Sequence, residues 1–156
     1  QTTARTCTRN GPLDVNAVLK DLSRIARESF EQSSGVRLAL KLESGLPAIR
    51  CDANRLKQVV LNLLKNAAEA MPTGGTVTLE SGRLEMEPPC VEVGVKDQGP
   101  GIPDEVAQHL FEPFRSTKGR QGLGLSIVYG IVRELGGTIT YETGSAGTVF
   151  RVRLPV

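Results

Sequence analysis

Two asparagines in a segment with otherwise strong helical character are residues whose type and spacing could do chemistry. Asn62 and Asn66 stand four residues apart, so on a helix their side chains share one face. Asparagine is less favourable than alanine inside a helix by roughly 0.5 kcal/mol, so two of them on one face suggest a use. An amide oxygen can coordinate Mg²⁺, which prefers oxygen ligands and keeps phosphate and water around it. A solvated polar face explains this segment equally well.

Asp97 follows an alternating apolar segment and precedes Gly99 and Gly101. A carboxylate at the end of a strand can accept the exocyclic amino group of adenine, while glycines let the backbone approach the base and sugar. A plain turn is the competing interpretation, because Asp and Gly are common turn residues. We reject a dinucleotide-binding fingerprint here, because the third glycine and the strand-to-helix context are missing.

A second pair of glycines, Gly122 and Gly124, opens a segment with helical periodicity. Free N–H groups and the dipole at the start of a helix favour an anion such as a triphosphate. Between the two glycine regions lie Arg115, Lys118 and Arg120, in a stretch that could close over phosphates. A solvated basic loop is the alternative when this stretch is read alone.

Hydrophobic periodicity predicts the elements that must position these residues. Helices are expected over residues 14–33 and 52–71, from about 103, and over 122–135; strands are expected over 36–42, 76–84, 90–96 and in a hairpin ending at 155. Asp52 is the expected N-cap of the second helix. The strands lie mostly in adjacent pairs. They therefore predict an α+β fold, with a mixed, mostly antiparallel sheet of about five strands and about three main helices on one face.

Composition narrows the function classes. The 156 residues suit one domain, and a net charge of +2 with 4% aromatic residues argues against a nucleic-acid partner. Cys7, Cys51 and Cys90 are scattered without a CxxC pair, so neither a disulfide framework nor a zinc site is expected. The one histidine, His109, is expected to be structural or solvent-exposed, because no second ligand or nucleophile lies nearby in the sequence. Apolar runs are too short for a membrane span and no signal peptide is evident, so we expect a cytoplasmic domain without direct membrane contact.

In combination, these segments resemble the C-terminal catalytic and ATP-binding domain of bacterial sensor histidine kinases, whose superfamily includes gyrase and Hsp-type chaperones. The resemblance covers residues 12–156, and residues 1–11 are expected to be a linker or a cloning remnant. Four motifs carry it: Asn62 to Asn66 is similar to the N box, Asp97 to Ile102 to the G1 box, Phe111 to Phe114 to the F box, and Gly122 to Leu125 to the G2 box. The wording FEPFRSTK is most similar to the nitrogen-regulation type of kinase.

The resemblance implies a two-layer α/β sandwich of the Bergerat type that binds ATP and Mg²⁺. Asp97 would bind adenine, helped by Thr148 through water, and Asn66 and Asn62 would hold the metal and phosphates. The catalytic residues it implies are Asn62, Asn66 and Lys118. The nucleotide-contacting residues it implies are Asn62, Lys65, Asn66, Asp97, Gly99, Gly101, Ile102, Arg115, Lys118, Gln121, Gly122, Leu123, Gly124, Leu125 and Thr148. Gln121 stands where the family more often has Thr, and its amide could reach the metal.

Asn62 separates enzyme classes within the superfamily. ATP-hydrolysing members, and the serine kinases that control sigma factors, carry Glu at this position; Glu can act as a general base and Asn cannot. The resemblance therefore implies phosphoryl transfer to a histidine on an upstream dimerisation domain, with a response regulator downstream. That histidine motif does not occur in this sequence, so we expect a monomeric catalytic fragment without autophosphorylation. The alternatives are a superfamily ATPase or serine kinase, or a non-catalytic ATP-binding module.

Overall fold

The computed structural model describes residues 11–33, 35–109, 111 and 119–156. Its helices are α2 (Val15–Ser33), α3 (Ala53–Glu69), α4 (Asp104–Ala107) and α5 (Gly119–Glu134). Its main strands are β2 (Val36–Leu42), β4 (Gly75–Leu84), β5 (Cys90–Lys96), β6 (Thr138–Gly144) and β7 (Gly147–Pro155). Two short strands, β1 (Pro12–Leu13) and β3 (Ile49–Arg50), pair with each other.

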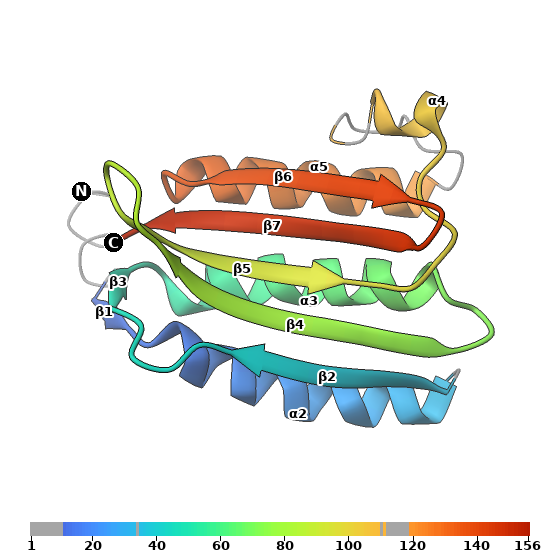
Figure 1. Cartoon of the computed structure of the whole chain (residues 1–156), viewed down its shortest axis with the longest axis horizontal. Coiled ribbons are helices and arrows are strands. Elements are labelled where there is room, and N and C mark those ends of the chain that lie inside the picture. Colours follow the sequence, from blue (N-terminus) through green and yellow to red (C-terminus); the bar gives the residue numbers. More distant parts are fainter. Residues whose placement is uncertain (1–10, 34, 110, 112–118) are drawn as a thin grey trace.

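The five main strands form one mixed sheet in the order β2-β4-β5-β7-β6. Of these pairings, only that of β2 with β4 is parallel. A parallel pair needs a crossover connection, and the helix α3, which lies between the two strands in the sequence, supplies it. The other three pairings are antiparallel. The three long helices cover one face of the sheet (Figure 1). The predicted fold class, a mixed and mostly antiparallel sheet with three main helices on one face, is confirmed.

The core lies between this sheet and the helices. The central helix α3 contributes the stripe that the sequence predicted: Leu56, Val59, Val60, Leu63, Leu64 and Ala67. Opposite them, Val91, Val93 and Val95 of the middle strand β5 are fully buried. The side chain of Asp52 caps α3 by accepting the N–H of Asn54 at 2.9 Å, as expected. The core thus holds α3 in a fixed place against β5, the strand that leads to Asp97.

One apolar assignment on α2 was wrong. The periodicity placed Ile25 on the buried face, but its side chain is 59% exposed. The helix instead buries Leu19 and Ala26. At 100° per residue, Ile25 lies about a quarter turn from the centre of the stripe that these residues share with Val15 and Leu22.

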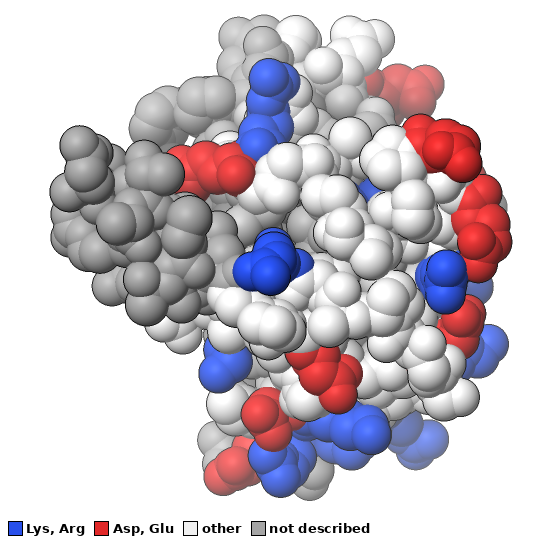
Figure 2. All heavy atoms as spheres, turned by 90° about the vertical axis from the view of Figure 1, so that its left-hand side faces the viewer, with Lys and Arg blue, Asp and Glu red and all other residues white. Residues whose placement is uncertain are grey.

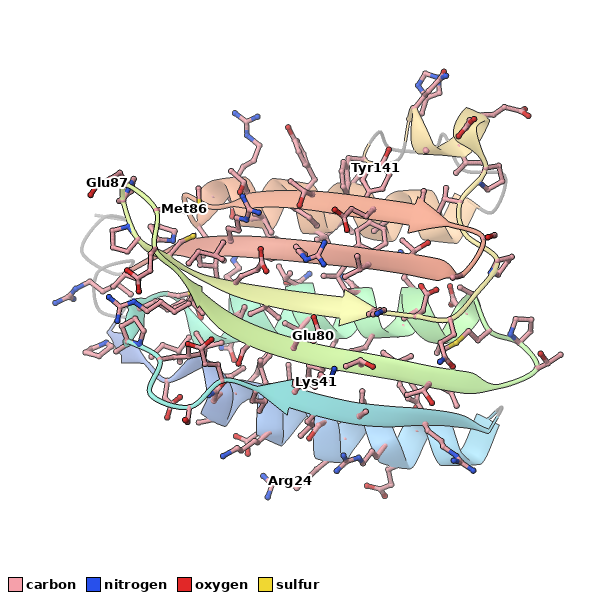
Figure 3. The ribbon with its side chains drawn as sticks, in the orientation of Figure 1. Arg24, Lys41, Glu80, Met86, Glu87 and Tyr141 are labelled. Atoms are coloured by element: carbon pink, nitrogen blue, oxygen red, sulfur yellow. The ribbon has the colours of Figure 1, made fainter. Side chains whose placement is uncertain are left out.

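The face of the sheet away from the helices carries charged side chains of both signs. Lys41 lies opposite Glu80 across β2 and β4, two residues labelled in Figure 3. Arg151 forms ion pairs with Glu92 and Glu142, and the hydrogen bond from Arg151 to Glu142 raises the pKa of the arginine. Acidic and basic residues are also interspersed at the end of the molecule that holds β1 and β3 (Figure 2).

Further expectations concern the cysteines and the membrane. Cys51 and Cys90 are free thiols within the core, as expected, and Cys7 lies outside the described residues. Burial raises the pKa of Cys51 to about 11, which keeps its thiol protonated and inert. Within the described ranges, no helix is long and apolar enough to cross a membrane.

Candidate nucleotide-binding site

Asp97 is a buried carboxylate at the point where β5 ends. Its side chain is 5% exposed. The oxygen Oδ1 accepts the backbone N–H of Gly99 at 2.9 Å and that of Thr148 at 3.2 Å. The N–H of Asp97 itself donates to the carbonyl of Thr148 at 2.8 Å. Both hydrogen bonds to the carboxylate end on Oδ1, so neither occupies Oδ2.

The charge of Asp97 is costly in this position. Burial raises the pKa of the carboxyl above its ordinary value, and the N–H groups of Gly99 and Thr148 only partly oppose that shift. In the described part of the chain, no lysine or arginine forms an ion pair with Asp97. A buried carboxylate that is oriented by backbone donors but lacks a cation is a candidate ligand-binding group.

Three glycines let backbone segments meet around Asp97. A Cβ on Gly99 would lie 2.7 Å from the carbonyl oxygen of Ala70, at the end of α3. A Cβ on Gly101, whose φ is +91°, would lie 2.3 Å from the carbonyl oxygen of Gly144. Gly147, with φ +141°, would bring a Cβ within 2.1 Å of the carbonyl oxygen of Asp97. These backbone contacts therefore require glycine at Gly99, Gly101 and Gly147. That Gly99 and Gly101 also let the backbone approach a base stays a prediction.

Side chains outside the predicted set hold the turn after Asp97. The hydroxyl of Thr143 accepts the N–H of Ile102 at 2.8 Å and lies 2.8 Å from the hydroxyl of the buried Thr148. The sulfur of Met71 accepts the N–H of Gln98 at 3.3 Å. Sequence reasoning missed both Thr143 and Met71. The first could have been found from the hairpin, because a two-residue turn between Gly144 and Gly147 places Thr143 opposite Thr148.

The predicted N box residues lie on α3, whose end touches the Asp97 turn. Asn62 and Asn66 are half-buried, and Lys65 is exposed. The carbonyl of Asn66 accepts the N–H of Ala70 at 3.1 Å. Ala70 is the residue that lies against Gly99. Asn66 therefore stands one helical turn from the contact with the Asp97 turn. The described residues include no group of three or more His, Cys, Asp or Glu side chains that could hold a metal ion.

The predicted G2 box lies further inside its helix than the sequence indicated. The helix α5 begins at Gly119, three residues before Gly122. The N–H groups without a partner inside a helix are those of the N-cap residue and the first three helical residues, since Leu56, the fourth residue of α3, already donates to its N-cap Asp52. By the same count, the whole stretch from Gly122 to Leu125 lies past the free N–H groups of α5. Glycines lower helix propensity by about 1 kcal/mol but do not prevent the hydrogen-bonding pattern from continuing, so they were a poor marker of the boundary. Leu125 packs its side chain into the core.

The F box begins at an aromatic cluster. The ring of Phe111 stacks on Tyr129 of α5 with centroids 5.3 Å apart, and meets Tyr141 and Phe150 edge-on at 6.2 and 6.4 Å. Tyr141, labelled in Figure 3, also donates its hydroxyl to the carbonyl of Ala107 at 3.1 Å. The cluster therefore joins Phe111 to α5, β6 and β7. The predicted phosphate contacts Arg115 and Lys118 lie outside the described residues, and of Gln121 only the backbone, which is helical, is described.

A family comparison agrees with this geometry. Residues 51–156 match the family described as histidine kinase-, DNA gyrase B-, and HSP90-like ATPases. The chain belongs to this family. The matched region runs from the start of α3 to the end of the chain and includes every residue that the sequence assigned to the site.

Two similar relatives are kinases by name. The chain is 38% identical over 145 residues to sporulation kinase E of Bacillus subtilis, covering 88% of this chain and 19% of that protein. It is 35% identical over 161 residues to the sensory histidine kinase/phosphatase NtrB of Rhizobium leguminosarum, covering 94% of this chain and 42% of NtrB. The chain therefore spans less than half the length of these relatives.

Solved structures give the same result for the fold. The catalytic domain of the histidine kinase ThkA superposes with a TM-score of 0.81 at 31% identity, covering 93% of this chain and 96% of that one. ThkA has also been solved with the response regulator TrrA, at a TM-score of 0.78 and 29% identity over 93% of this chain and 41% of ThkA. Full-length ShkA in complex with AMPPNP superposes with a TM-score of 0.79 at 30% identity, over 93% of this chain and 30% of ShkA. The Bergerat fold and the resemblance to histidine kinase catalytic domains are confirmed.

The raised pKa of Asp97 predicts how stability depends on pH. Asp97→Asn keeps an oxygen for the N–H groups of Gly99 and Thr148 and removes the buried charge. In the parent, the free energy of unfolding falls as pH rises from the unfolded pKa of aspartate, about 4, to the raised folded pKa, because the folded state holds the proton more tightly. The nucleotide-free variant should therefore gain stability relative to the parent across this interval and keep that gain above it.

Urea unfolding at a series of pH values measures this difference. Asp104→Asn, which removes an exposed carboxylate on α4, controls for the loss of one charge. An Asp97→Asn variant that loses stability relative to the parent as pH rises would show that the carboxylate is stabilised, not penalised, by its surroundings.

Proposed function

We propose that this domain binds ATP and donates its γ-phosphoryl group to a histidine on a separate dimerisation domain. The observation that carries the proposal is Asp97, a buried carboxylate held by two backbone N–H groups on one oxygen, between glycines that leave no room for a side chain. This arrangement suits a flat base that donates a hydrogen bond from an amino group.

Adenine fits this acceptor better than guanine does. The exocyclic amino group of adenine can donate to Oδ2 of Asp97, while guanine would present a carbonyl oxygen to the same carboxylate. An unpaired buried acceptor facing a second acceptor costs free energy, so the wrong base is rejected. Gly99, Gly101 and Ile102 would form the wall beside the base, and Thr148 would reach it through water.

The phosphates are assigned to the helical side of the site. Asn66 and Asn62 would hold Mg²⁺, which neutralises phosphate charge as the γ-phosphoryl group leaves ADP. Lys65 is exposed on the same helix and can reach a phosphate. The family resemblance assigns the same role to Arg115, to Lys118 and to the backbone from Gly122 to Leu125, and it would bring the amide of Gln121 to the metal. Because that backbone lies inside α5, the start of the helix would have to rearrange when a phosphate binds there.

Transfer to histidine suits the residues present. A neutral imidazole has a lone pair on its attacking nitrogen, so no general base is required when that nitrogen attacks the γ-phosphorus and the bond to ADP breaks. Asn62 can orient phosphate oxygens but cannot deprotonate water or a serine hydroxyl. We therefore infer that the first partner is the protein's own dimerisation domain and the second a response regulator. ThkA has been solved in complex with such a regulator, TrrA. We also infer that the domain acts in the cytoplasm.

The test of the base site is ATP affinity. Asp97→Asn should lower it by roughly ten- to a hundredfold while the fold survives, because removing a partner from a buried polar contact costs about 1–3 kcal/mol. Titration calorimetry gives the dissociation constant, with Asp104→Asn as the matched control that should bind like the parent. Unchanged affinity in Asp97→Asn would defeat the assignment of Asp97 to adenine.

The metal assignment predicts a loss of the response to Mg²⁺. Asn66→Ala should bind ATP equally well with Mg²⁺ and with a chelator, whereas the parent binds better with Mg²⁺. Asn54→Ala changes an exposed asparagine in the first turn of the same helix and should behave like the parent. The same Mg²⁺ enhancement in Asn66→Ala and the parent would reject the metal role.

The transfer step needs an acceptor that this chain lacks. With γ-labelled ATP, the isolated chain should form no acid-labile phosphohistidine, because His109 is not placed in line with a γ-phosphate. Adding its own dimerisation domain in trans should label that domain's histidine, slowly, because a covalent tether no longer raises the effective concentration. Phosphorylation of His109 would contradict the proposal that the acceptor histidine lies on another domain. Rapid ATP hydrolysis without an acceptor would indicate that the domain is an ATPase.

A further inference from the structure

Thr143 connects the turn that follows Asp97 to the hydroxyl nearest the proposed base site. It is the residue opposite Thr148 in the β6–β7 hairpin. Its Oγ1 accepts the N–H of Ile102 at 2.8 Å and lies 2.8 Å from the Oγ1 of Thr148. Thr148 is itself buried, and its backbone N–H donates to Asp97. Thr143 therefore forms one hydrogen bond to Ile102, in the turn after Asp97, and one to Thr148, in the hairpin, but none to Asp97 itself.

A backbone N–H can only donate, so Thr143 must accept from Ile102. Either hydroxyl could donate across the contact between Thr143 and Thr148, and each has a single proton. If Thr143 donates, the proton of Thr148 is left for an acceptor on a bound base, and every group is then satisfied. If Thr148 donates, its proton is used inside the hairpin and Thr148 can offer none to the base. Only the order Ile102 to Thr143 to Thr148 therefore makes Thr148 a donor toward the site.

We propose that Thr143 is a positioning residue that makes Thr148 a donor toward the bound base and so contributes to selection of adenine over guanine. The inference rests on the proposed function and extends it to a residue that does not touch the nucleotide. Adenine presents an acceptor at N1 beside its amino group, which complements a donor at Thr148, directly or through water, and the acceptor Asp97. Guanine presents N1–H and a carbonyl oxygen, so both contacts are mismatched.

The same residue fixes where the turn lies. Gly101 is pressed against the hairpin, since a Cβ there would lie 2.3 Å from the carbonyl oxygen of Gly144 and 3.2 Å from the hydroxyl of Thr143. The hydrogen bond from Ile102 to Thr143 is formed at this close approach. Without the hydroxyl, the N–H of Ile102 would lose its partner and the turn could move away from β6. Thr143 therefore acts on the base site from two sides, through Thr148 and through the turn.

Removing the hydroxyl without changing the shape tests the inference. Thr143→Val deletes the hydrogen bonds, Thr143→Ser retains them, and Thr140→Val makes the same exchange at an exposed position of the same strand. Calorimetry with ATP and with GTP should show roughly tenfold weaker ATP binding for Thr143→Val and a similar fall in the preference for ATP. Thr143→Ser should restore both values, and Thr140→Val should match the parent.

Hydrogen exchange in the nucleotide-free protein gives a readout that does not depend on ATP. Thr143→Val should lower the protection of the Ile102 amide, and Thr143→Ser should keep it. The role of Thr143 would be overturned if Thr143→Val left the protection of the Ile102 amide unchanged. It would also be overturned if the parent binds ATP and Thr143→Val shows the same preference for ATP over GTP. A parent that binds no ATP would sink the proposed function instead, while the exchange result would still decide the positioning. If Thr143→Val does not fold by circular dichroism, Thr143→Ala replaces it with the same expected outcomes.

Discussion

The site depends on one constraint: a buried carboxylate at the end of the middle strand needs donors that only backbone can supply. Asp97 obtains them from Gly99, two residues ahead, and from Thr148 of β7. This requires the turn after β5, the β6–β7 hairpin and the end of α3 to meet without intervening side chains. The glycines at Gly99, Gly101 and Gly147 make that approach possible. The sheet order, with β7 beside β5, brings Thr148 to the place where it is needed.

Much of the fold could be predicted, because local periodicity and burial agree along most of the chain. The strands β2 and β5 have the predicted bounds, and Asp52 caps α3 as expected. The errors arise where local signals are weak. Ile25 has the correct spacing from Leu22 but the wrong angular position, and β1 and β3 are two-residue strands whose pairing is decided by distant contacts. Gly122 predicted the start of a helix, but α5 begins three residues earlier, at Gly119.

The site was only partly visible in the sequence, for a related reason. Asp97 could be singled out because it directly follows a buried strand and precedes two glycines, and Asn66 because it is a poor helix former that shares a helix face with Asn62. Thr143 and Met71 carry no such mark. The role of Thr143 comes from the register of the hairpin, which a two-residue turn between Gly144 and Gly147 would have indicated. The role of Met71 comes from the packing of α3 against the Asp97 turn, which joins residues 27 positions apart and is not encoded locally.

The β6–β7 hairpin shows how one element serves binding and stability together. Three pairs face inward across it in register: Thr143 with Thr148, Tyr141 with Phe150, and Ile139 with Val152. The first pair is polar and lies beside Asp97, at the proposed base site. The second pair contacts Phe111 at the start of the predicted F box, and the third belongs to the core. Cross-strand pairs contribute roughly 0.2–1 kcal/mol each, and aromatic contacts about 0.5–1.5 kcal/mol. Because the pairs share one rigid ladder, a shift of register by one residue would remove the core, the F box anchor and the base site at once.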